Sequence, residues 1–213
     1  MSEPEQRTVV RIDPACASAV AALEHDPFYR SICADHVHDT VRRRAVLAQY
    51  FAYSIQEGND MGRCVHLADR TRGVAVWLLP QAANVRLRAA QSKRVFLEAT
   101  LDPEGCANYY RIVNFMSAQA VSVVDDDAWY LSIVAVDPAA QGQGLGRKLL
   151  EPTIAEADRV SATCYLETFS TRSVSFYGRL GFTTQARFAE PSTGAAYALM
   201  IRYPSAPTEN GAR

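Results

Sequence analysis

The sequence contains no apolar run long enough to cross a membrane. Runs such as residues 74–79 hold six apolar side chains, whereas a transmembrane helix needs roughly 20. Residues 1–7 lack the basic and apolar regions of a signal peptide. We therefore expect a cytoplasmic protein with no membrane partner.

An excess of either charge is also missing. The 22 Lys and Arg residues are balanced by 23 Asp and Glu residues, which leaves a net charge of −1. Proteins dedicated to nucleic-acid binding usually carry a basic excess. Local basic groups, at residues 42–44 and 86–94, are typical of solvated helix faces. The charge balance therefore predicts no nucleic-acid partner.

Cysteine and histidine are few and scattered. The five cysteines are odd in number and contain no CxxC pair, which argues against a disulfide framework or a zinc site and fits a reducing compartment. The four histidines contain no HExxH arrangement. His36 and His38 lie two residues apart, but no Cys or carboxylate pattern accompanies them. We expect no metal.

What the sequence does contain is ordinary globular composition, with 48% hydrophobic and 21% charged residues. Periodicity, capping residues and turn residues predict helices and strands that alternate along the chain. The expected helices are 14–24, 40–57 (ended by the glycine turn at 58–60), two between 82 and 119, 144–158 and 172–180. The expected strands are 8–12, 63–68 and 73–79 (a hairpin), 129–136, 163–167, 182–188 and 195–203. This alternation predicts one mixed α/β domain over residues 1–204 and a frayed tail over 205–213.

A glycine-rich loop follows the expected strand 129–136 and opens a helix. Glycines let backbone N–H groups approach a ligand closely, and a helix start attracts anions such as pyrophosphate. The spacing is not that of a dinucleotide fold, and no Walker lysine is present. A flexible turn has a similar composition, so the loop alone leaves both interpretations open. The candidate cofactor-binding residues here are Gln141, Gly142, Gln143, Gly144, Leu145, Gly146 and Arg147.

A second segment, residues 164–182, combines a strand, a helix start and a closing motif of Phe176, Tyr177, Leu180, Gly181 and Phe182. Together with the glycine loop, it resembles the GNAT superfamily of N-acetyltransferases. Within that superfamily the chain looks closest to the puromycin N-acetyltransferase group, through residues 75–77, 128–131 and 166–168. The resemblance is dense over 128–188 and thin over 1–120.

The resemblance implies an α/β fold of the GNAT type. In this fold a central, mostly antiparallel mixed sheet is splayed at the acetyl-CoA site and flanked by helices. It also implies direct attack of an amine on the thioester of acetyl-CoA. In such an enzyme the amides of Val134, Ala135 and Val136 would pair with the pantetheine arm, and Val134 N–H would point at the acetyl carbonyl. Ser173 stands where the family often has an asparagine that contacts this arm.

The resemblance further implies that Tyr177 is the general acid that protonates the leaving thiolate. Glu167, at the end of its expected strand, is the candidate general base, acting directly or through water. A structural or acceptor-binding role fits Glu167 equally well. Phe28 and Tyr29 are candidates for stacking against the acceptor.

The leading functional hypothesis is an acetyl-CoA-dependent N-acetyltransferase that acts on a small-molecule amine, including antibiotic or toxin inactivation, as a monomer or homodimer. One alternative is acetylation of a protein or peptide, which usually needs an open groove. Another is a catalytically silent sensor that binds CoA on the same fold. Fold class alone does not decide among these.

Overall fold

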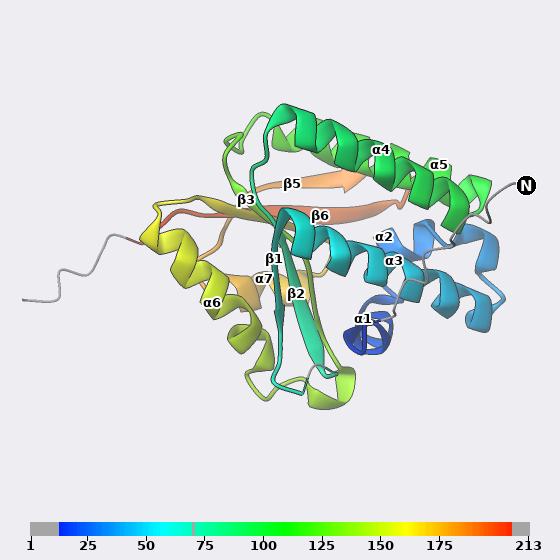
Figure 1. Ribbon diagram of the computed structural model, residues 1–213, viewed down its shortest axis with the longest axis horizontal. Helices are drawn as coiled ribbons and strands as arrows, with labels where there is room; N and C mark the ends of the chain where they lie inside the picture. The colour runs from blue at the N-terminus through cyan, green and yellow to red at the C-terminus, as the bar shows by residue number, and fades with distance from the viewer. Residues whose placement is uncertain (1–12, 70, 206–213) are drawn as a thin grey trace, which may run out of the picture.

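The computed structural model describes residues 13–69 and 71–205 (Figure 1). Helices and strands alternate along the chain, as the sequence predicts. The elements are α1 (Ala15–Leu23), α2 (Pro27–Ser31), the 3-10 turn η1 (Ala34–His36), α3 (Thr40–Met61), β1 (Gly62–His66), β2 (Gly73–Leu78), α4 (Ala83–Thr100), α5 (Pro103–Ala120), β3 (Trp129–Val136), the 3-10 turn η2 (Pro138–Ala140), α6 (Leu145–Arg159), β4 (Cys164–Thr168), α7 (Thr171–Gly178), β5 (Thr183–Glu190) and β6 (Ala195–Arg202). The expected strand 8–12 lies outside the described residues.

One sheet holds all six described strands, in the order β1-β2-β3-β4-β6-β5. Every neighbouring pair is antiparallel except β3 and β4, which are parallel. Helix α6 makes the connection between these two strands, as a parallel pair requires. β3 and β4 pair only at Trp129 with Cys164 and at Tyr130 with Tyr165. The expectation of a mostly antiparallel mixed sheet that splays open is confirmed.

A bulge in β3 lies next to the splay. Val76 of β2 pairs with Ile133 and Trp77 pairs with Leu131, so Ser132 is an extra residue on β3. A bulge of this kind bends a strand and increases its twist. The half of β3 that follows therefore turns away from β4 while it stays paired with β2.

Two hydrophobic cores cover the two faces of the sheet. Because successive side chains of a strand point to opposite faces, Val74 and Val76 of β2 pack with α1 and α3, while Ala75 and Trp77 pack with α6. Figure 1 shows α1 and α3 on one side of β2 and α6 on the other. Burial on both faces explains why β2 reads as a continuous apolar run.

Helices α4 and α5 form a hairpin that runs past the end of the sheet where β5 and β6 lie (Figure 1). The two helices expected between residues 82 and 119 are thus confirmed. The break between them coincides with Pro103, which occupies the first turn of α5, where its missing N–H has no helical partner to lose. Tyr109 of α5 and Leu97 of α4 pack into the same core as α1 and α3.

The end expected for the second long helix, at Gly58, is wrong, because α3 continues to Met61. A Cβ at Gly58 would lie 2.6 Å from Cγ1 of Val76. Glycine at this position lets α3 pack closely against β2, so it is a packing residue and not a helix stop. None of the helices within the described ranges is long and apolar enough to cross a membrane.

Candidate active site

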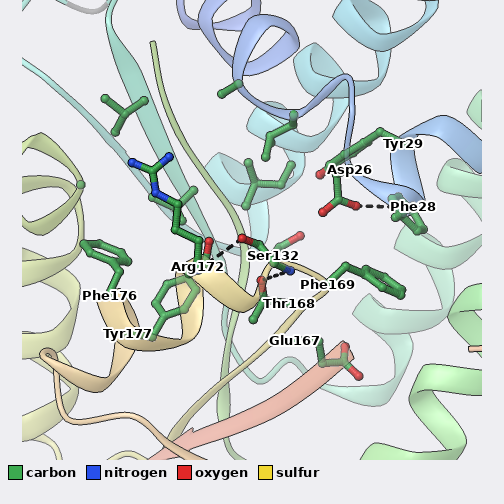
Figure 2. Close-up of a pocket in the computed structure, with 18 of the residues that line it drawn as sticks. Asp26, Phe28, Tyr29, Ser132, Glu167, Thr168, Phe169, Arg172, Phe176 and Tyr177 are labelled. Carbon is green, nitrogen blue, oxygen red and sulfur yellow. Dashed lines mark hydrogen bonds between the residues drawn. The ribbon is translucent and has the colours of Figure 1, made fainter. Parts of the chain in front are cut away.

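A cavity of about 1060 Å³ follows the splay between β3 and β4. Its lining comes from segments far apart in the sequence: the α1–α2 loop, helices α4 and α5, the outer parts of β3 and β4, the glycine loop with the start of α6, and α7. Figure 2 shows the central part of this lining, with Tyr177 and Phe176 on one side and Asp26, Phe28 and Tyr29 on the other. The cavity therefore brings together both predicted motifs and the N-terminal aromatic residues.

The glycine loop presents open backbone to one end of the cavity. Gly142 and Gly144 have φ values of +81° and +75°, and no atom lies within 4 Å of a Cβ built on either residue. The first amides of α6 follow directly, and the first four N–H groups of a helix lack intrahelical partners. These features fit an anionic group such as pyrophosphate.

Gly146 lines the cavity and also lies in a close contact between two helices. A Cβ at this position would lie 3.0 Å from Cζ of Phe176. The absence of a side chain at Gly146 thus permits close contact between α6 and α7. Gly146 thus brings α6, which starts at the glycine loop, into contact with α7, which carries Tyr177.

Three arginines line the cavity: Arg147 from the start of α6, Arg172 from the first turn of α7 and Arg179 from the C-cap of α7. Nε of Arg147 lies 2.5 Å from Oε1 of Glu151, one turn further along α6. Sequence reasoning missed Arg172, which lies in the first turn of α7. A cation near a helix start is unfavourable for the helix dipole. This pattern singled out Arg147 in the sequence, and it could have identified Arg172 as well.

Most of the predicted cofactor-binding residues line the cavity, and two do not. Val134 and Val136 line the cavity from the part of β3 that is no longer paired with β4, and Ser173 lines it from α7. The side chain of Gln141 lies at the loop, where its Nε2 donates to the carbonyl of Val136 at 3.1 Å. The other lining residues of this set are Gly142, Gly144, Leu145, Gly146 and Arg147. Ala135 packs into the core with α1 and α3, and Gln143 is an exposed residue outside the cavity lining.

Tyr177 is buried and lines the cavity from α7. Its ring packs 5.1 Å from that of Phe176 and 6.0 Å from that of Phe182. Burial raises the pKa of the Tyr177 hydroxyl well above its usual value of 10, and the negative charge of Asp26 adds to the shift. The hydroxyl is therefore protonated near neutral pH and can act as a proton donor.

Glu167 lies near the end of β4, with one carboxylate oxygen buried and unpartnered among the described residues. The Tyr130 hydroxyl donates to the other oxygen at 3.5 Å. Burial raises the pKa of the Glu167 carboxyl from 4.5 to about 7, and the Tyr130 hydrogen bond lowers it. A carboxyl that titrates near neutral pH can exchange protons with an amine.

Replacement of Glu167 by glutamine is expected to reduce turnover in a pH-dependent way. If the carboxylate removes a proton from an ammonium group, the loss should be about tenfold or more near pH 7. It should shrink above the pKa of the amine, where the amine is already neutral. Steady-state rates from pH 6 to 10 measure this, and an equal loss at every pH would assign Glu167 to positioning.

The same variant is expected to be more stable than the wild type at alkaline pH. Because the folded-state pKa is raised, ionisation of Glu167 costs stability progressively between pH 4.5 and about 7. The full cost is about 3 kcal/mol at 1.36 kcal/mol per pKa unit. Urea unfolding should show this gain at pH 8 and no gain at pH 4, and a variant that is less stable at pH 8 would contradict the assignment.

Aromatic side chains form the wall opposite the glycine loop. The ring of Phe28 lies 5.1 Å from Tyr29, 6.2 Å from Tyr50 and 5.9 Å from Tyr109, in edge-on arrangements. All four residues line the cavity, including Phe28 and Tyr29, whose role in acceptor binding stays a prediction. Sequence reasoning missed Asp26, Tyr130 and Ser132, which line the same space. Within the described ranges, no group of three or more His, Cys, Asp or Glu side chains is arranged to hold a metal ion.

A splayed sheet beside a glycine-rich helix start is the central feature of the site, and the known proteins that this chain resembles are acetyltransferases. The profile of the acetyltransferase (GNAT) domain family matches residues 109–184. An uncharacterized N-acetyltransferase of Schizosaccharomyces pombe is 27% identical over 176 residues, which cover 80% of this chain and 70% of the relative.

Solved structures agree with this result. A structure from Corynebacterium glutamicum, described as histone acetyltransferase HPA2 and related acetyltransferase, is 25% identical, covers 92% of both chains and superposes with a TM-score of 0.59. Arylalkylamine N-acetyltransferase 2 from Aedes aegypti is 14% identical, covers 89% of this chain and 93% of its own, and shares the fold with a TM-score of 0.57. Residues 109–184 match the acetyltransferase (GNAT) domain, the fold is that of GNAT proteins, and the protein is an acyltransferase.

Proposed function

We propose that the protein is an acetyl-CoA-dependent N-acetyltransferase whose acceptor is a small-molecule amine. The observation that carries this proposal is the single cavity that joins the glycine loop, Tyr177 and the aromatic wall. A cofactor bound at the loop and an acceptor bound at the aromatic wall would meet next to the Tyr177 hydroxyl. The resemblance to the puromycin N-acetyltransferase group also supports a small amine.

In the proposed reaction acetyl-CoA supplies the thioester, and the residues of the chain position and protonate the reactants. Gly142, Gly144 and the start of α6 hold the pyrophosphate, while the backbone of Val134 and Val136 orients the arm that carries the acetyl group. The amine nitrogen forms a bond to the carbonyl carbon as the carbon–sulfur bond breaks. Tyr177 gives its proton to the departing sulfur and is reprotonated from solvent.

Glu167 accepts the proton that an ammonium acceptor loses before it attacks, and passes this proton to solvent. The second proton, which the nitrogen loses as the amide forms, balances the proton that Tyr177 gives to the sulfur. A carboxyl with a pKa of about 7 is partly ionised at neutral pH, and it is a stronger base than an ordinary exposed glutamate. Because Glu167 takes the ammonium proton within the cavity, the proton does not have to reach bulk water in the same step. Tyr177 and Glu167 thus divide the two proton transfers between α7 and β4.

The shape of the cavity favours a small acceptor over a peptide. Helix α5 contributes Tyr109, Val113 and Met116 to the wall opposite the loop. An extended peptide that crosses the cavity would meet these side chains, whereas a compact amine fits between them and the loop. The α4–α5 hairpin thus supports the small-molecule hypothesis.

Release of CoA thiol from acetyl-CoA across a panel of small amines, aminated antibiotics and peptides tests the proposal. We expect turnover with small amines and at most a background rate with peptides. Turnover restricted to peptides would contradict the proposed acceptor class. Tight acetyl-CoA binding, measured by calorimetry, with no turnover of any amine would favour a silent sensor.

A further inference from the structure

We propose that Asp26 binds the positively charged nitrogen of the acceptor, so that the site selects amines that are protonated in solution. The inference rests on the proposed function and deepens it, because it names the charge state of the substrate and the residue that recognises it. Asp26 lies in the loop between α1 and α2, outside both sequence motifs, and lines the cavity.

The carboxylate of Asp26 is held in place by its own helix. Its Oδ1 accepts a hydrogen bond of 2.9 Å from Phe28 N–H as the N-cap of α2. Figure 2 shows this bond and places Asp26 beside Tyr29, on the aromatic side of the cavity. One oxygen is thus used by the cap, and the other is available to a ligand.

Three shielded carboxylates of the described chain have cationic partners, whereas Asp26, like Glu167 and Glu190, has none among the described residues. Glu24 pairs with Arg44 at 2.7 Å, Glu57 with Lys93 at 2.7 Å, and Asp158 with Arg202 at 2.7 Å. The Asp26 carboxylate has the Phe28 N–H as its hydrogen-bond donor, and burial raises its pKa to about 6. It is therefore mostly ionised at pH 7.5 without a neutralising charge. A buried carboxylate in this state is costly, and a bound ammonium group would offset the cost.

The positive and negative side chains of the cavity come from different elements, as binding of an anionic cofactor and a cationic acceptor requires. Arg147 lines the cavity from α6, which follows the glycine loop, and Arg172 and Arg179 line it from α7 and its C-cap. Lys93 is the one cationic lining residue that the described helices α4 and α5 contribute at the aromatic wall. It is already paired with Glu57. Asp26 therefore makes this part of the cavity anionic, which suits a cationic acceptor and not a second phosphate.

The charges of Asp26 and Glu167 influence different tyrosines of the site. The charge of Asp26 contributes to the raised pKa values of Tyr29 and Tyr177. The charge of Glu167 contributes to those of Tyr130, Tyr165 and Tyr197. Asp26 is thus the carboxylate associated with the proton donor Tyr177, next to which the amine must react. An ammonium group at Asp26 would also contact the aromatic faces of Phe28 and Tyr29, which attract cations.

The test compares two acceptors in the wild type and in Asp26→Asn. The first is 2-phenylethylamine, which is cationic at pH 7.5, and the second is an arylhydrazine, whose terminal nitrogen is neutral at that pH. In Asp26→Asn we expect KM for the cationic amine to rise about 30-fold, the effect of losing a hydrogen bond to a charged group. We expect KM for the hydrazine and the affinity for acetyl-CoA to change less than about threefold.

Asparagine is a matched substitution, because it caps helices as well as aspartate does and removes only the charge. Asp126→Asn removes the same charge from an exposed turn outside the cavity and should leave both KM values unchanged.

An unchanged KM for the cationic amine in Asp26→Asn, or an equal rise for both acceptors, would overturn the inference. Should Asp26→Asn not fold, a wild type that prefers the neutral acceptor would overturn it as well. A wild type that turns over neither acceptor, nor any other amine, contradicts the proposed function itself.

Discussion

Replacement of Tyr177 by phenylalanine is expected to lower kcat by about tenfold or more, because general acid catalysis typically contributes about 10²- to 10⁴-fold. The substitution removes one hydroxyl and keeps the ring that packs against Phe176 and Phe182. Acetyl-CoA affinity should therefore change less than about threefold. Steady-state kinetics and calorimetric titration separate the two effects.

The pKa of Tyr177 bears directly on this prediction. A tyrosine hydroxyl is already a weaker acid than a thiol by about 1.5 pKa units, and burial raises its pKa further. The same buried site also disfavours a free thiolate, so the leaving sulfur needs a proton more here than it does in water. The donor and the group it protonates are thus shifted in the same direction by the same cause.

Tyr110→Phe is the matched control, since Tyr110 lies on α5 but does not line the cavity. It should retain wild-type kcat and wild-type acetyl-CoA affinity. A Tyr177→Phe enzyme with wild-type kcat would mean that the thiolate leaves unaided or is protonated by water. A parallel loss of acetyl-CoA affinity would instead place Tyr177 in cofactor binding.

Replacement of Gly144 by aspartate is expected to weaken acetyl-CoA binding by about 100-fold or more. The new carboxylate would face pyrophosphate at the start of α6, and repulsion between such charges amounts to about 3 kcal/mol in a partly screened site. The fold should survive, because nothing lies within 4 Å of a Cβ at this position. Aspartate also tolerates positive φ values better than most residues. Isothermal titration calorimetry with acetyl-CoA measures the loss.

Two variants separate charge from backbone strain. Gly144→Asn has nearly the same shape as Gly144→Asp without the charge, so its affinity should fall about tenfold less. Gly194→Asp introduces the same residue at a similar φ of +66°, in the turn between β5 and β6 and outside the cavity lining, and it should bind acetyl-CoA normally. Equal losses in Gly144→Asn and Gly144→Asp would contradict an anion site at this loop.

Gly146 does not belong in the same experiment, although the sequence motif treats the two glycines alike. A side chain there would first meet Phe176 at 3.0 Å and displace α7, which carries Tyr177. The loss in such a variant would therefore combine cofactor binding with the position of the proposed acid. The positive φ of Gly144 and the packing of α6 against α7 at Gly146 separate the two glycines.

Local sequence determined the elements from which the site is built. The strand, glycine loop and helix start over residues 129–159 depend on backbone preferences within a few residues, and they lie where the sequence predicts them. The same holds for the break at Pro103 and for the hairpin of β1 and β2. These features carry the family resemblance, which is why fold class and enzyme class were accessible from the sequence.

Only the tertiary structure decided which residues share the cavity. In the sequence Asp26 stands in a break between two expected helices, and it joins the site because α1, α2 and α5 pack into one core against the sheet. The pKa of Glu167 depends on burial by strands and loops that are distant along the chain. Burial, pairing and distance are properties of segments brought together by packing, and no local pattern encodes them. The sequence by itself therefore determined the class of reaction, whereas the folded chain decided which charges and rings face the acceptor.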